Sequence, residues 1–176
     1  MNKRVFDLLH CQAFQPIRSS FSMQFHKIRK TYMSPFVSIS LDRFNQQVLA
    51  CQDEAFTLAF SILGEESAAC EVVLKAIQQV YSDCGKEDIA IAVNILQRVI
   101  LLCRKVETSK TYNPKEWIPG WNQLEHSERE ALLLVDVIQK SYQEAVVILN
   151  NSESGVARVV AQGRYKLIRN SDLVPE

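Results

Sequence analysis

The residues best suited to metal binding or nucleophilic chemistry in this chain are its five cysteines and three histidines. The cysteines, at positions 11, 51, 70, 84 and 103, are widely spaced, and no Cys-x-x-Cys pair occurs. His10, His26 and His126 have no partner at the short spacing that zinc sites use. Free cysteines beside apolar helical faces behave as small hydrophobic residues, which fits the reducing cytoplasm. We therefore expect no metal site and no cofactor.

Other catalytic arrangements are also missing from the sequence. The five glycines are isolated, so no glycine-rich phosphate loop is present. The acid pairs Glu65–Glu66 and Glu128 with Glu130 stand at expected helix starts, where acids are typical of capping and of favourable dipole interactions. The sequence therefore predicts a protein that is not an enzyme.

The strongest chemical pattern is a run of cations near the C-terminus. Residues 154 to 169 contain four cations and no acid. On a helix over 153–168 the valines would face inward, leaving Ser154, Arg158 and Gln162 outward with Arg164 and Lys166 beside them. Cations suit phosphates, while an arginine and a glutamine one turn apart can address base edges. The alternative is an αα-hairpin whose basic face is only solvated.

Apolar residues at helical spacing predict three long helices in the first part of the chain. The first covers 41–63, and Gly64 ends it as a C-terminal glycine. The second follows Glu65-Glu66-Ser67 and ends near 83–85. The third covers 87–105, where cations near its end suit the helix dipole. Residues 107–121 break this periodicity and read as a linker, in which Trp117 and Trp121 are expected to pack on a neighbouring domain.

Three shorter helices are expected after the linker. Ser127 is expected to cap a helix over 128–138 with Glu130 as its capping-box partner, and Ser141 with Glu144 to cap a helix over 142–149. A polar turn over 150–152 then leads into the last helix. This order is the plan of a helix-turn-helix.

Composition agrees with a helical globular protein. Of the 176 residues, 47% are hydrophobic and 23% charged, and the 20 cations balance the 20 acids. No apolar run approaches the roughly 20 residues of a membrane span, so we expect no membrane insertion. We predict an all-α fold of two small helical domains, a three-helix bundle over 36–106 and a helix-turn-helix domain over 122–170, joined by the linker at 107–121.

The first 33 residues differ from the rest. Residues 1–32 hold six cations and one acid, a net charge of +5, so the remaining chain sums to −5. This arm reads as a transit peptide, as a nucleic-acid-binding tail, or as a disordered segment ahead of a true start at Met33. We favour the last of these.

The order of segments resembles the extracytoplasmic-function sigma factors of bacterial RNA polymerase. The resemblance rests on Phe56 to Gly64, Ala68 to Val73, a proline-bearing linker, Leu124 to Leu134 and Ser141 to Ala145. It implies a region-2 bundle that binds the polymerase clamp and opens promoter DNA, and a region-4 helix-turn-helix that reads it. The partners so implied are core RNA polymerase, double-stranded promoter DNA and an anti-sigma factor.

The resemblance also assigns roles to individual residues. It implies polymerase binding by Glu66, Glu71, Lys75 and Gln78; promoter melting by Arg98, Arg104 and Lys105; and DNA binding by Ser154, Arg158, Gln162, Arg164 and Lys166.

The chain departs from the family pattern at several of these positions. Leu74 replaces the usual glutamine of the clamp-binding helix, the third helix lacks the usual tryptophan, and Gly163 stands inside the last helix at a cost of ~1 kcal/mol relative to alanine. A degenerate sigma-like module that regulates by protein interaction, without opening promoters, is therefore the alternative function.

Overall fold

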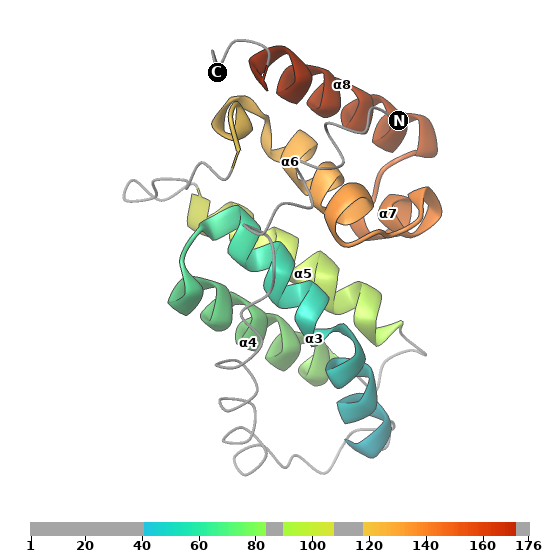
Figure 1. The fold of residues 1–176 in the computed structure, drawn as a ribbon. Helices are drawn as coiled ribbons and strands as arrows, with labels where there is room; N and C mark the ends of the chain where they lie inside the picture. The colour runs from blue at the N-terminus through green and yellow to red at the C-terminus, as the bar shows by residue number, and fades with distance from the viewer. Residues whose placement is uncertain (1–40, 84–89, 108–117, 172–176) are drawn as a thin grey trace.

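A computed structural model describes residues 41–83, 90–107 and 118–171 (Figure 1). Within these ranges every regular element is a helix, which confirms the all-α fold. The basic arm, most of the linker with Trp117, and the expected start of the third helix lie outside the described residues. None of the described helices is both long and apolar enough to cross a membrane.

The first three helices pack against one another. They are α3 (Leu41–Leu63), α4 (Glu66–Asp83) and α5 (Ile91–Glu107). Gly64 ends α3 with a φ of 72°, and its N–H donates to the Phe60 carbonyl at 2.8 Å. Leu58, Val73 and Val99 are fully buried between these helices. The apolar spacing of the sequence predicted all three helices.

The C-terminal helices begin after a 3₁₀ turn, η2 (Trp121–Gln123). Helix α6 (His126–Leu132) continues into a π-helical turn, η3 (Leu133–Val137), and is followed by α7 (Tyr142–Leu149) and α8 (Glu153–Ser171). Trp121 is 1% exposed, as expected of a tryptophan that packs on its surroundings.

The predicted start of α6 is wrong. Glu125, and not Ser127, is the N-cap, and its N–H donates to Glu128 Oε2 at 2.8 Å in the capping box. Ser127-x-x-Glu130 fits the usual capping-box pattern, whereas Glu125 is not a usual N-cap residue; the earlier start leaves Glu130 free to pair with Arg104 of α5.

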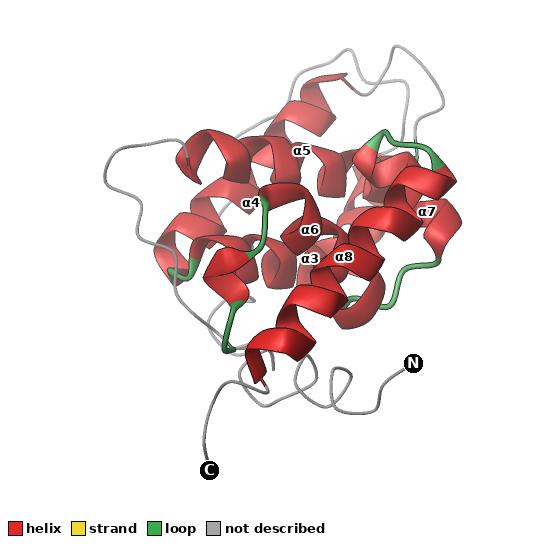
Figure 2. Ribbon diagram, turned by 90° about the horizontal axis from the view of Figure 1, so that it is seen from above, coloured by secondary structure: helices red, strands yellow, loops and turns green. Residues whose placement is uncertain are grey.

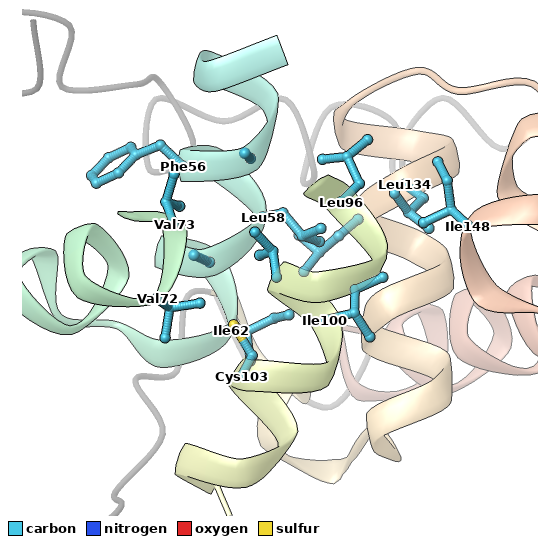
Figure 3. Close-up of a cluster of buried hydrophobic side chains, with 14 of the residues drawn as sticks. Phe56, Leu58, Ile62, Val72, Val73, Leu96, Ile100, Cys103, Leu134 and Ile148 are labelled. Atoms are coloured by element: carbon cyan, nitrogen blue, oxygen red, sulfur yellow. The ribbon is translucent and has the colours of Figure 1, made fainter. Parts of the chain in front are cut away.

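The two groups of helices share one apolar core. Helix α5 packs against α7, and α3 packs against α6 and η3, an arrangement visible from two sides in Figures 1 and 2. Figure 3 shows Leu134 and Ile148 of the C-terminal group beside Leu96 and Ile100 of α5. Contacts across this seam therefore position the C-terminal helices on the bundle.

Candidate nucleic-acid interface

The helix-turn-helix is built by local hydrogen bonds. Ser141 caps α7 as predicted: its Oγ accepts from the Glu144 N–H at 3.2 Å, and Glu144 Oε2 accepts from the Ser141 N–H at 2.8 Å. Asn150 ends α7 with a φ of 49°. The hydroxyl of Ser152 then accepts from the Gly155 N–H at 3.1 Å and caps α8. The polar turn predicted over 150–152 is confirmed.

Helix α8 has two distinct faces. Val156, Val160 and Leu167 are at most 1% exposed and pack inward. The outward positions are all exposed: Ser154, Ala157, Arg158, Ala161, Gln162 and Tyr165. Side chains of the types that contact bases and phosphates therefore stand on the open face of the last helix.

Two of the predicted DNA-binding cations, Arg164 and Lys166, are half-buried and pair with buried acids. Arg164 Nε donates to Asp136 Oδ2 at 3.0 Å, and its Nη2 bonds the second oxygen of the same carboxylate. Lys166 Nζ donates to Glu128 Oε2 at 2.8 Å. The two carboxylates are only 6% and 4% exposed, so each pair is partly desolvated.

The predicted promoter-melting cations of α5 have mixed surroundings. Arg104 makes a two-pronged bond to Glu130 of α6, with Nε to Oε1 at 2.6 Å, and the carboxylate is 3% exposed. Arg98 pairs with Asp83 of α4 at 3.0 Å. Lys105 is exposed. Arg104 thus links the two groups of helices.

Further charged residues close the seam beside Arg104. Glu107 Oε2 lies 2.6 Å from His126 Nδ1, and Glu107 Oε1 lies 2.9 Å from Arg129 Nη2. The ion pair between Glu107 and Arg129 is not aligned as a hydrogen bond, because the buried Glu107 Oε1 accepts no hydrogen bond from the described residues. Lys140 Nζ donates to Glu54 Oε1 of α3 at 2.8 Å. These pairs link the C-terminal group of helices to the bundle.

The predicted polymerase-binding residues lie along α4. Glu71, Lys75 and Gln78 are exposed at helical spacing and share one face, while Glu66 is half-buried in the first turn. The opposite face buries Val72, Val73 and Ala76. The bundle therefore presents a polar row of the residue types that an interface with another protein can use.

The described cysteines are buried thiols. Cys51, Cys70 and Cys103 are free. Burial is the main cause that raises the pKa of Cys51 to about 11, and it also raises the pKa values of Cys70 and Cys103. No cluster of three or more metal-ligating side chains occurs among the described residues. These thiols pack as hydrophobic side chains in the described core.

Comparison with known proteins finds similarity in fold but none in sequence. No family model and no curated protein matches the chain. Among solved structures it is similar to the sigma factor RpoE of Bartonella quintana, determined in complex with the anti-sigma factor NepR. The TM-score is 0.58 at 14% identity, over 77% of this chain and 100% of that chain. The fold is therefore similar to that of this sigma factor.

Three acids of the α6–η3 segment were not predicted from the sequence as partners of functional residues. Glu128, Glu130 and Asp136 are each buried against a cation that the sequence had assigned to nucleic acid. Their only local signal is their place within the apolar run around Ala131 to Leu134, where an acid is buried only with a partner. Which cation pairs with each acid depends on the tertiary fold.

Proposed function

We propose that this protein is a sigma factor-like transcription initiation protein that reads duplex promoter DNA with α8. The supporting observation is the exposed row of Ser154, Arg158 and Gln162 on a capped helix-turn-helix, opposite buried valines. These three residues are spaced four apart in the sequence, so their side chains lie along one line of the helix. Arginine and glutamine match the hydrogen-bonding edges of guanine and adenine in the major groove.

In this proposal α4 docks on core RNA polymerase through its exposed row, with Glu71 as the central acid. The sigma-like fold supports this division of labour, in which the bundle binds polymerase and the last helix binds DNA. Such a protein works in the cytoplasm, where the polymerase is. An anti-sigma factor would be a natural regulator, since the similar RpoE was solved with one.

Two side chains of α5 make contacts with the C-terminal helices that compete with promoter melting in this proposal. The Arg104 guanidinium is occupied by Glu130, and the Gln97 amide donates to the Val147 carbonyl of α7 at 2.8 Å. Contact of Arg104 or Gln97 with DNA would therefore have to replace these bonds to the C-terminal helices.

The second candidate function is a sigma-like interaction module that does not open promoters. The observation that favours it is that Arg104, Arg164 and Lys166 are engaged with buried acids. A cation neutralised in this way adds little to the attraction of DNA. The partner of such a module would be another protein.

Two reciprocal variants of the full chain test the first function. Glu71→Lys is expected to abolish co-purification with core polymerase and leave duplex binding unchanged. Arg158→Ala is expected to do the reverse, and to weaken duplex binding by ~1 to 3 kcal/mol, or about 5- to 150-fold, as measured by fluorescence anisotropy. Each variant is the control for the other surface.

The outcomes separate the two functions. A parent protein that binds neither polymerase nor duplex DNA, while remaining helical by circular dichroism, would overturn the first function and favour the interaction module. Loss of both activities in both variants would indicate unfolding, which the same spectrum would show.

A further inference from the structure

We propose that Asp136 and Glu128 are positioning residues, which fix the rotation of α8 through Arg164 and Lys166. The two cations then hold the reading helix in place and do not contact DNA phosphates. This inference rests on the proposed function of α8. It assigns to two of the expected DNA-binding residues a different role at the same site.

The geometry is a three-point attachment. Glu128, Leu132 and Asp136 stand four residues apart along α6 and η3, so they form one row. Lys166 meets the first of them, and Arg164 meets the last. Between these pairs Gly163 approaches Leu132 so closely that an added Cβ would lie 2.8 Å from Leu132 Cδ1.

The two ion pairs flank this close contact around the circumference of α8. At about 100° per residue, Arg164 lies about 100° to one side of Gly163, and Lys166 about 60° to the other. Rotation of α8 in either direction must therefore stretch one of the two pairs. Both carboxylates are buried, so an acid whose ion pair is stretched would lose its cation and would gain no water in exchange, which costs free energy.

The reading row runs from the flank to the far side of the same helix. By the same spacing, Ser154, Arg158 and Gln162 project about 100° to 180° away from Gly163. A rotation of about 20° at a side-chain radius of about 5 to 6 Å moves a tip by about 2 Å. Hydrogen bonds to base edges tolerate a spread of only about 0.5 Å in donor–acceptor distance. Base reading therefore depends on a helix that cannot turn.

Salt dependence separates a positioning cation from a phosphate contact. The probes are a random-sequence duplex pool and the duplex that the parent protein enriches from it, both measured by anisotropy over a range of KCl concentrations. If Arg164 positions α8, Arg164→Gln leaves the slope of log affinity against log salt unchanged. Preference for the enriched duplex then falls about tenfold or more. If Arg164 contacts a phosphate, the slope weakens by about 0.9 and both duplexes lose affinity equally, which would overturn the proposal.

Matched variants complete the test. Arg169→Gln removes an exposed cation from the same helix and shows the effect of losing charge alone. The exchange Asp136→Arg with Arg164→Asp restores an ion pair of the opposite sense, so it should recover the preference lost in Arg164→Gln. For a phosphate contact the exchange would instead place a repulsive acid at position 164.

A measurement without DNA keeps the positioning role testable if the exchanged pair does not fold. Spin labels are attached to Leu49→Cys and Tyr165→Cys, both exposed in the parent, with Cys11 and Cys84 replaced by serine. The distance distribution between the labels should broaden in Asp136→Asn and in Glu128→Gln. An unchanged distribution in both would overturn the positioning role.

The failures are distinguishable. A parent protein that binds no duplex would overturn the proposed function of α8, and the spin-label result would then decide the positioning role by itself. Duplex binding without any enriched sequence would overturn the claim that the positioned face reads bases.

Discussion

The substitution Gly163→Ala gives opposite expectations from the sequence and from the structure. In an isolated helix, alanine is favoured over glycine by about 0.8 to 1.0 kcal/mol, so the replacement should stabilise α8. In the folded protein Gly163 is buried, and an added Cβ would lie 2.8 Å from Cδ1 and 3.2 Å from Cγ of Leu132. The sign of the stability change therefore reports whether the helix contact or the helix propensity dominates.

The structural cost exceeds the propensity gain. Leu132 is fully buried, so its side chain cannot turn away without displacing other core residues. The Glu128 Cβ, at 3.4 Å, limits the shift on the other side. Overpacking of this kind costs about 1 to 3 kcal/mol. Subtracting the propensity gain of about 1 kcal/mol leaves a net destabilisation of about 1 kcal/mol.

Urea unfolding followed by circular dichroism measures this difference. With a slope of about 2 kcal/mol/M, the midpoint should fall by about 0.5 M. Ala161→Gly is the control, because Ala161 is exposed on the same helix and should lose about 1 kcal/mol through propensity alone. Both opposite replacements are thus expected to destabilise. A midpoint that rises in Gly163→Ala would refute the close packing of α6 on α8.

Three further results are expected from other parts of the structure. Ser141→Ala should cost about 1 kcal/mol at pH 7. Because hydrogen bonds from Ser141 lower the pKa of Glu144, the parent should lose this stability as the pH falls below about 4. Thermal unfolding should show a shallower loss in the variant, and parallel pH curves would contradict the capping box. A double-mutant cycle of Arg104→Ala and Glu130→Gln should give a coupling of about 1.5 to 3 kcal/mol in urea unfolding. Additive single effects would contradict that bond. Burial and nearby acids raise the pKa of Cys103, so its alkylation at pH 8, followed by mass spectrometry, should be much slower than that of a free thiol. An equal rate would argue against its burial.

Elements that depend on local spacing were predictable from the sequence. Helix α3 ends at Leu63 as the apolar period and Gly64 predicted, and the Ser141 capping box starts α7 as expected. The start of α6 was not, because Ser127-x-x-Glu130 fits the usual capping-box pattern while the observed box uses Glu125, which is not a usual N-cap residue. Only the tertiary partner of Glu130 distinguishes the two, and local sequence holds no information about it.

The roles of charged residues were less predictable, because their partners are distant in sequence. Arg104 and Glu130 are 26 residues apart, Asp136 and Arg164 28. The sequence shows that cations are concentrated in residues 154–169. It does not show which of them already pair with an acid of the protein and which are available to a ligand. The pairing of each buried acid with its cation depends on how α6 packs against α5 and α8, which the tertiary structure alone shows.

The α6–η3 segment carries three buried acids that pair with cations of the neighbouring helices, an arrangement that the net charge of the chain does not show. Its buried acids face α5 on one side, through Glu130, and α8 on the other, through Glu128 and Asp136. A partner that separates α6 from α5 would break the two-pronged bond between Arg104 and Glu130, so the loss of this charge-assisted bond opposes separation. Loss of the α8 pairs carries the same penalty. The arrangement of α5, α6 and α8 is therefore coupled to these specific acid–cation pairs, and any change in it must break or exchange them.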